Sequence, residues 1–175
     1  MMNADRQHSD VFSPEKRSSV MRSIGRRDTR PEMQLRRLLS AHGFRYRLKR
    51  ADLPFSPDIV FPSARLAVFV HGCFWHGHAC HLFRWPRSNA AFWRAKIERN
   101  VQRDLRVESQ LLERGWRSLT VWECSFRGRH RPDPRALVSA VQSVLDDPGV
   151  GVSHIPHGQR ACFLPIENRS EGVDF

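Results

Sequence analysis

The sequence lacks long apolar runs and is poor in cysteine and acidic residues. No stretch approaches the roughly 18 consecutive apolar residues of a membrane-spanning helix. The N-terminus has no apolar segment of the kind that secretory signals need, so we expect a cytoplasmic protein. There are four cysteines with histidines among them, which favours a metal site or free thiols over disulfides. Asp and Glu number 18 against 29 Lys and Arg, a formal net charge of +11.

The basic excess is concentrated near the N-terminus. Residues 1–50 hold 13 basic and 5 acidic side chains, and 26 of the 29 basic residues are Arg. The planar guanidinium of Arg suits phosphates and base edges, so this distribution predicts a nucleic-acid partner. Hydrophobic residues make up 40% of the 175 residues, which is enough for one folded domain.

Hydrophobic periodicity and turn signals predict the element order α-α-β-β-β-α-β-α. Helices are expected at 13–25, 29–43, 89–114 and 133–145, and strands at 44–48, 58–61, 66–70 and 116–122. This order predicts an α/β fold with a central mixed sheet and helices on both faces. We therefore expect one domain over residues 1–145, which opens with a basic arm or helix at 1–27. A tail of low order is expected at 146–175, because it has several Pro and Gly and no periodicity.

The loop expected at residues 71–88 is dense in metal-ligand residues. Zinc prefers four thiolate or imidazole ligands in a tetrahedron, and a closed set of four is structural rather than catalytic. One such set is Cys73, His78, Cys80 and Cys124. Its spacing is not that of an ordinary zinc finger, and three more histidines lie in the loop: His71, His76 and His81. Cys162, in the expected tail, is interpreted as an unpaired thiol.

Several carboxylates have both an ordinary and a functional interpretation. Asp58 precedes an apolar strand, where metal-dependent nucleases place an acid for Mg²⁺, yet an exposed turn Asp looks the same in sequence. Glu32 fits a capping box at the start of a helix. On the long helix, Asn100 and Asp104 fall on the apolar stripe beside Ile97, where polar side chains are costly without partners.

Aromatic residues crowd the same loop and the start of the long helix. Phe74, Trp75 and Trp93 are the members nearest to the candidate metal ligands. On a basic protein, such side chains can wedge between base steps and unstack them. Packing into a hydrophobic core is the alternative interpretation of each one.

The run Val70-His71-Gly72-Cys73-Phe74-Trp75-His76-Gly77-His78-Ala79-Cys80 resembles a hallmark of the very-short-patch repair endonucleases. Further matching segments are Met21-Arg22-Ser23-Ile24, Arg27-Asp28-Thr29, Pro57-Asp58, Phe92-Trp93, Lys96-Ile97, Asn100-Val101, Arg103-Asp104, Trp122-Glu123-Cys124 and Arg127-Gly128. The resemblance covers about residues 10–130 and implies a restriction-endonuclease-like fold. It implies an Mg²⁺-dependent enzyme that nicks double-stranded DNA 5′ to the T of a T:G mispair. Such mispairs arise when 5-methylcytosine is deaminated, and the nick starts very-short-patch repair.

The resemblance also implies partners and residue roles. The expected partners are T:G-mismatched DNA, functional coupling to a 5-methylcytosine methyltransferase and mismatch-repair proteins of the MutL and MutS type; we expect a monomer. Asp58 and the backbone carbonyl of Val70 would bind magnesium, and His76 would activate the attacking water. Glu32 and Asp104 would support the waters around the metal and the histidine. The structural zinc would be held by Cys73, His78, Cys80 and Cys124. DNA contacts are expected from a wedge of Phe74, Trp75 and Trp93, and from Met21, Arg22 and Lys96.

Two departures from related patterns matter. Val stands at position 70 where the family commonly has Thr, but only the backbone carbonyl is needed there. The Glu-x-Lys pair of many restriction enzymes is absent from the second strand, so further catalytic groups must come from elsewhere, which gives weight to His76 and Asp104. Two alternatives stay open: a non-catalytic zinc module that binds DNA, and a nuclease whose catalytic metal lies at His71 and His76.

Overall fold

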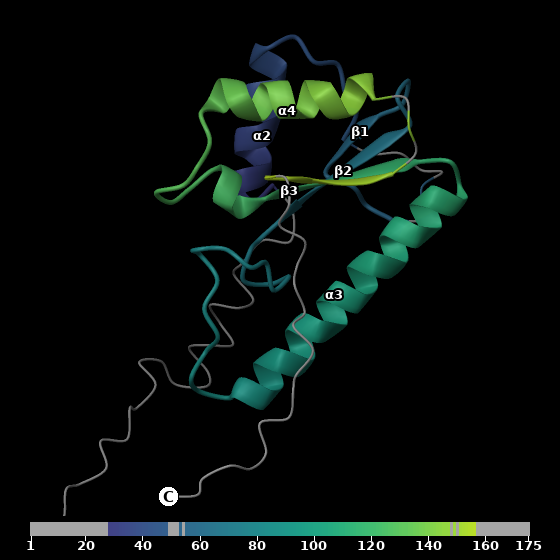
Figure 1. Ribbon diagram of the computed structural model, residues 1–175. Helices are drawn as coiled ribbons and strands as arrows, with labels where there is room; N and C mark the ends of the chain where they lie inside the picture. The colour runs from purple at the N-terminus through teal and green to yellow at the C-terminus, as the bar shows by residue number, and fades with distance from the viewer. Residues whose placement is uncertain (1–27, 49–52, 54, 148, 150, 157–175) are drawn as a thin grey trace, which may run out of the picture.

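The computed structural model describes residues 28–48, 53, 55–147, 149 and 151–156 (Figure 1). The elements in chain order are α2 (Arg30–Ala41), β1 (Ile59–Phe61), β2 (Leu66–His71), α3 (Ala90–Glu113), β3 (Arg117–Trp122), the short 3₁₀ turn η1 (Glu123–Ser125), α4 (Pro134–Asp146) and β4 (Val152–Ile155). The helix expected at 13–25 and the basic arm at 1–27 lie outside the described residues. No helix in the described part of the chain is long and apolar enough to cross a membrane.

The four strands form one mixed sheet in the order β1-β2-β3-β4. β1 pairs with β2 antiparallel, while β2 pairs with β3 and β3 with β4 in parallel. The strand β4 corrects the sequence-based expectation of low order for residues 152–155, whereas residues 157–175 of the expected tail lie outside the described residues. Four residues of that segment pair with β3, from Ser118 opposite Val152 to Val121 opposite Ile155. Hydrogen bonding to the edge of a buried strand orders a segment that has no clear periodicity of its own.

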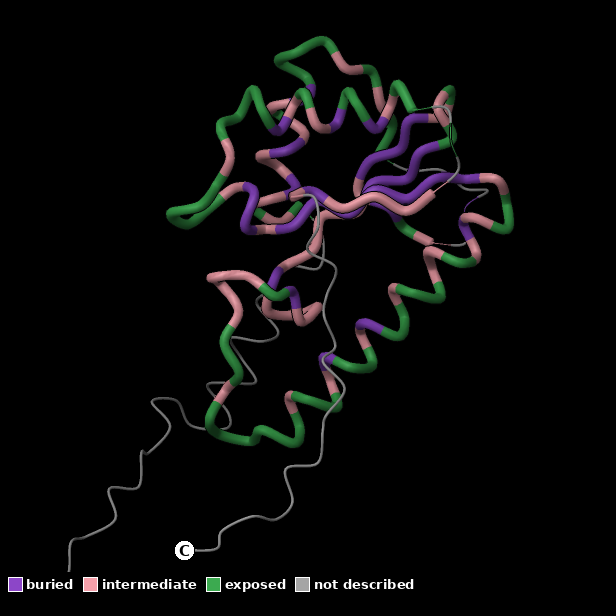
Figure 2. The backbone as a smooth tube through the Cα atoms, in the orientation of Figure 1, coloured by how far each residue is buried: buried purple, intermediate pink, exposed green. Residues whose placement is uncertain are grey.

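Helices cover both faces of the sheet, as the element order predicts (Figures 1 and 2). On β2, Leu66 and Val68 lie on the face that packs against α2 and α4, whereas Ala67 lies on the face that packs against the end of α3. This alternation follows from the two-residue repeat of a strand. Because both faces are covered, β2 and β3 are apolar over most of their length and form the centre of the core.

The prediction of a strand at residues 44–48 is wrong. The only ladder pairing of this segment among the described residues is a single bridge, Arg47 opposite Val60. Phe44 and Tyr46 instead pack edge-on against Phe61, each with ring centroids 6.2 Å apart. The alternating aromatic residues thus bury themselves as a strand would, but aromatic packing rather than a ladder of hydrogen bonds holds them.

The long helix α3 reaches beyond the sheet. Its C-terminal part packs Leu111 into the core, while its N-terminal half passes the loop of residues 72–89 (Figure 1). The two are close enough that a Cβ on Gly77 would lie 3.0 Å from the side chain of Ile97. Gly77 also has a φ of 61°, a left-handed conformation that glycine adopts without steric cost. The helix and the loop therefore form one support beside the carboxyl end of β2.

Candidate active site and metal centre

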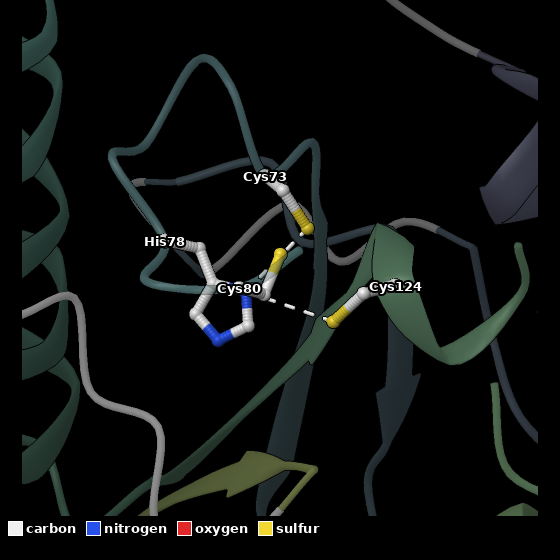
Figure 3. Close-up of side chains that lie close together, drawn as sticks. All are labelled: Cys73, His78, Cys80 and Cys124. Carbon is white, nitrogen blue, oxygen red and sulfur yellow. Dashed lines mark hydrogen bonds between the residues drawn. The ribbon is translucent and has the colours of Figure 1, made fainter. Parts of the chain in front are cut away.

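Four metal-ligand side chains converge where the loop meets η1 (Figure 3). The ligand atoms of Cys73, His78, Cys80 and Cys124 all lie within 4.8 Å of one another. His78 Nδ1 is 3.4 Å from the sulfur of Cys73 and 3.6 Å from that of Cys124. Cys73 and His78 are fully buried. Three residues from one loop and one from 44 residues later therefore form a closed cluster of four potential ligands.

The chemistry of this cluster fits a soft divalent cation. A hydrogen bond with the Cys124 thiol, followed by burial, raises the pKa of the Cys73 thiol well above its usual range, and burial also raises the pKa of Cys80. Packed thiols cannot ionise together without a cation, but a metal ion deprotonates coordinating thiols. His78 stacks on Trp122 with ring centroids 4.1 Å apart, which fixes its ring with Nδ1 toward the sulfurs. The cluster thus suits a structural metal ion of the zinc type.

A second group of polar side chains lines a cleft of about 390 Å³ at the carboxyl end of β2. The residues of the cleft that carry titratable or metal-ligating groups include Glu32, Asp58, His71, His76, Arg103, Asp104 and Glu108. They come from α2, the segment before β1, the end of β2, the loop of residues 72–89 and α3. The fold therefore brings together all four catalytic candidates of the sequence, Asp58, His76, Glu32 and Asp104.

Asp58 is fixed by the antiparallel pairing of β1 with β2. Its backbone N–H donates to the carbonyl of Val68 at 2.9 Å, and its Oδ2 accepts from the N–H of Val70 at 2.7 Å. Burial, opposed by the Val70 hydrogen bond and reinforced by Glu32, raises the pKa of Asp58 to about 6. A half-buried carboxylate is a hard oxygen ligand, so it fits Mg²⁺. Val70, the proposed carbonyl ligand, also lines the cleft.

Glu32 is buried at the first turn of α2 and faces the same cleft. Its Oε1 accepts from the hydroxyl of Thr29 at 2.7 Å, and its Oε2 accepts from the N–H of Asp28 at 2.9 Å. The capping role expected from the sequence is therefore present in a variant form, because Glu32 reaches back to the N–H that precedes the N-cap residue. Capping and a place in the cleft turn out to be compatible.

His76 forms a hydrogen bond between Nδ1 and Oδ2 of Asp104. Although burial alone raises the pKa of Asp104, the hydrogen bond and charge of His76, helped by Arg103, lower it overall. Arg103 binds the other oxygen of Asp104, Oδ1, at 3.0 Å. Asp104 is therefore a carboxylate held between two cationic or proton-donating partners. A polar side chain on the apolar stripe of α3 needs a partner, and for Asp104 that partner is His76.

His71 stacks on His76 with ring centroids 3.8 Å apart and an angle of 9° between the rings. Burial and then the neighbouring His76 hold the pKa of His71 well below its usual range, so the His71 ring is neutral. Nδ1 of His71 also lies 3.9 Å from Oδ2 of Asp104, so both histidines face this carboxylate. From the sequence, His71 was either a spare ligand or, with His76, a ligand of a catalytic metal. Its position directly after Val70, at the end of a central strand, is the signal that places it at the cleft.

The loop backbone around His76 is held from two sides. Asn100 on α3 donates from Nδ2 to the carbonyl of Trp75 at 2.8 Å, so the other polar residue on the apolar stripe also has a partner. Glu123 accepts from the N–H of Cys73 at 3.2 Å. These contacts fix the residues on either side of Phe74 and Trp75.

The aromatic residues of the loop and α3 form a half-buried cluster next to the cleft. Phe74 packs edge-on against Trp75 and Trp93, with ring centroids 5.2 Å apart in both pairs. The ammonium of Lys96 lies 5.2 Å from the Trp75 ring centre and 5.6 Å from that of Trp93. All three proposed wedge residues and Lys96 are thus neighbours. Met21 and Arg22, the other expected DNA contacts, lie outside the described residues.

Comparisons with known proteins identify the family. A family model described as DNA mismatch endonuclease Vsr matches residues 9–82. The DNA mismatch endonuclease Vsr of Escherichia coli (strain K12) is 45% identical over 134 residues, covering 77% of this chain and 86% of that protein. The Type II nicking enzyme V.XorIIP of Xanthomonas oryzae pv. oryzae is 46% identical over 138 residues, covering 79% of this chain and 98% of that protein. The chain belongs to the Vsr family of DNA mismatch endonucleases.

A more distant relative extends the comparison. The Type II nicking enzyme V.NaeI of Lentzea aerocolonigenes is 39% identical over 147 residues, which are 81% of this chain and 80% of that protein. Membership of the Vsr family makes the chain a DNA endonuclease with DNA as its substrate. The family predicted from the motif is thereby confirmed. The alternative of a non-catalytic DNA-binding module does not agree with membership of an endonuclease family.

Proposed function

We propose that this protein nicks double-stranded DNA 5′ to the T of a T:G mispair left by deamination of 5-methylcytosine, with Mg²⁺ in the cleft and zinc in the Cys₃His cluster. The observation that carries the proposal is the meeting of Glu32, Asp58, His76 and Asp104 in one cleft beside an aromatic cluster. We extend the proposal to the fold, as a restriction-endonuclease-like arrangement built on the mixed four-stranded sheet.

Phosphodiester hydrolysis needs charge neutralisation and an activated water. Bound magnesium supplies the first by neutralising charge on the phosphate, with Asp58 and the carbonyl of Val70 as its proposed protein ligands. His76 supplies the second as the general base. Because Asp104 accepts from Nδ1, the imidazole presents its unprotonated Nε2 to water, and the carboxylate stabilises the imidazolium that forms.

Mismatch selectivity is proposed to come from Phe74, Trp75 and Trp93. A mispair is already poorly stacked, so inserting aromatic side chains costs less there than in a matched duplex. The wedge and the base share two supports, because Trp75 and His76 are adjacent in the loop and both are tied to α3. Insertion at the mispair would thereby set the position of the backbone over the cleft. Lys96 is placed to contact a phosphate from the rim of the wedge.

A catalytic metal bound by both His71 and His76 is disfavoured by their geometry. Their potential ligand atoms and that of Asp104 do lie within 4.8 Å of one another. The two rings, however, are parallel to within 9°, so their in-plane lone pairs run side by side and do not converge on one point. His76 also already bonds Asp104 through Nδ1. This geometry favours a base held by a carboxylate over a metal site.

The biological setting follows from the proposed substrate. T:G mispairs from 5-methylcytosine require a methyltransferase that makes the methylated base, so functional coupling to such an enzyme is part of the proposal. Cooperation with repair proteins of the MutL and MutS type, and action as a monomer, are proposed with it.

The direct test is a nicking assay on duplexes that differ only at one base pair. The purified protein with Mg²⁺ is expected to nick the T-containing strand of T:G duplexes on the 5′ side of the T and to leave C:G duplexes intact. Asp58→Asn should bind both duplexes as the wild type does but not nick. Equal nicking of matched and T:G duplexes would refute mismatch specificity, and nicking in magnesium-free buffer would refute the metal assignment.

A further inference from the structure

Arg36 is a largely covered cation behind the two carboxylates of the cleft. It lies one turn after Glu32 on α2, and its side chain is only 13% exposed. Its Nη2 lies 3.4 Å from Oε2 of Glu32 and 3.4 Å from the backbone carbonyl of Asp58, while Nη1 pairs with the carboxylate of Asp28. One planar guanidinium therefore bridges the helix that carries Glu32 and the segment that carries Asp58.

The contacts of Glu32 limit what its carboxylate can do. An ionised carboxylate has about four acceptor sites. Asp28 and Arg36 occupy Oε2, and the Thr29 hydroxyl occupies one site of Oε1. A swing of Glu32 toward a metal ion at Asp58 would break these three interactions. The remaining lone pair on Oε1 can accept a hydrogen bond from water without any movement.

Charge balance points the same way. Glu32 and Asp58 line one cleft, so their negative charges oppose each other. The guanidinium of Arg36 lies 3.4 Å from Oε2 of Glu32 and 3.4 Å from the backbone carbonyl of Asp58. The cation therefore offsets the repulsion between the two acids.

We propose that Arg36 is a positioning residue that restrains Glu32 from direct metal coordination, so that Asp58 is the sole side-chain carboxylate bound to the cation and Glu32 orients water. This inference rests on the proposed magnesium site at Asp58. It predicts an unusual pair of effects when Arg36 is lost. Metal binding becomes tighter, because the cleft loses a positive charge and Glu32 loses one of the three interactions that hold it away from the metal. Nicking becomes slower, because Glu32 no longer holds its place.

The experiment measures metal binding separately from catalysis. Mn²⁺ affinity is followed by electron paramagnetic resonance on the zinc-loaded protein without DNA, and nicking is followed in single-turnover reactions at saturating Mg²⁺. Arg36→Met, which keeps the apolar stem, is expected to bind Mn²⁺ about 10-fold tighter or more and to nick at least about 10-fold slower. The matched control is Arg37→Met, an exposed neighbour on the same helix that should change neither quantity.

A purely structural role for Arg36 predicts the opposite metal result. If its loss merely loosened the site, Arg36→Met would bind Mn²⁺ more weakly and nick more slowly, and that outcome would overturn the proposal. Unchanged Mn²⁺ affinity or unchanged nicking would overturn it as well. Arg36→Lys covers the case in which the Met variant does not fold. An ammonium keeps the charge but cannot bridge three acceptors in one plane, so slower nicking without weaker Mn²⁺ binding is expected. Nicking by Arg36→Lys at the wild-type rate would contradict the restraint.

Restraint of Glu32 can be separated from charge alone by a double-mutant cycle. In a Glu32→Gln background there is no second carboxylate to release, so Arg36→Met should tighten Mn²⁺ binding much less than in the wild type. Equal tightening in both backgrounds would assign the whole effect to charge and refute the restraint. Failure of the wild type to nick T:G duplexes would count against the proposed function, whereas a normal wild type beside an unaffected Arg36→Met would count against this inference alone.

Discussion

The Nδ1 atom of His76 bonds the carboxylate of Asp104, although 28 positions separate the two residues in the chain. Asp104 comes from the middle of α3, and His76 comes from the loop between Cys73 and His78 of the Cys₃His cluster. Each would be unremarkable alone, since one is a histidine in a metal-rich loop and the other an acid on an apolar stripe. Together they form a carboxylate–imidazole pair that opens into the cleft of Asp58.

Asp104→Asn tests this pair. The amide keeps the size of the side chain but removes the charge that stabilises the imidazolium, so single-turnover nicking should fall by about 100-fold. DNA affinity measured without magnesium should stay within about twofold of the wild type, because phosphate contacts dominate binding. Glu98→Gln, an exposed change on the same helix, is the control. A wild-type nicking rate in Asp104→Asn would remove Asp104 from the mechanism.

Asp58→Asn should stabilise the protein while abolishing nicking. The folded-state pKa of Asp58 is raised to about 6 from 3.8, so the folded protein holds this proton more tightly than the unfolded chain. Its contribution to stability is therefore fully present below about pH 4 and is lost as the pH rises through 6. At pH 8 without magnesium, the ionised Asp58 destabilises the fold by up to about 3 kcal/mol, which the amide avoids.

Urea unfolding at pH 8 and pH 5 measures this effect. The gain in unfolding free energy from Asp58→Asn should be larger at pH 8 than at pH 5, and added Mg²⁺ should stabilise the wild type but not the variant. Glu98→Gln should show no such dependence on pH or magnesium. If the gain is the same at both pH values, burial of the Asp58 charge is not its cause.

One tightly bound zinc per chain is expected from the Cys₃His cluster. Elemental analysis of the purified protein gives the stoichiometry. Cys124→Ala removes a ligand from η1, directly after β3, and should lower the melting temperature and release the metal, because a zinc site contributes its binding energy to folding. Cys162→Ala, outside both the ligand set and the described residues, should do neither. A folded and active sample without zinc would exclude a structural metal.

Trp75→Ala tests the wedge. Stacking of a base on an aromatic ring is worth about 1–3 kcal/mol, roughly 5- to 150-fold in affinity. Affinity for T:G duplex and the nicking rate should fall together by such a factor, while affinity for matched duplex, set by phosphates, should hardly change. His76→Ala should show the reverse, with selective binding kept and nicking lost. Equal weakening toward both duplexes would mean that Trp75 only packs against Phe74 and Trp93.

Local sequence signals determined much of this structure. Two helices were predicted correctly from their first residues: Pro134 follows Asp133 at the start of α4, and Pro31 follows Thr29 at the start of α2. A capping residue followed by proline is typical of the first turn of a helix. The 24-residue helix α3 was equally clear, because apolar residues at helical spacing leave one buried stripe. The motif around Cys73 was sufficient to predict the family.

Local sequence patterns failed to predict the conformation of two segments, because contacts with residues far along the chain decide it. Residues 152–155 have no strand pattern of their own and become β4 only because the edge of β3 offers unpaired backbone groups. The segment 44–48 has a strand pattern but lies against Phe61 through its aromatic rings, with a single bridge to β1. Neither outcome can be predicted from residues within a few positions of the segment.

The sequence by itself determined which groups the site contains: the four residues of the Cys₃His cluster, the candidate acids, and His76 directly after the aromatic pair Phe74-Trp75. Only the tertiary structure decided how these groups lie relative to one another. Glu32 and Asp58 are 26 residues apart in the chain, and Asp58 and Asp104 are 46 apart. They line one cleft because the sheet places α2 and α3 around the end of β2. It also decided that Arg36 lies behind both Glu32 and Asp58. The reason is physical: side-chain chemistry is local and can be recognised in sequence, whereas distance, burial and charge balance arise only from packing.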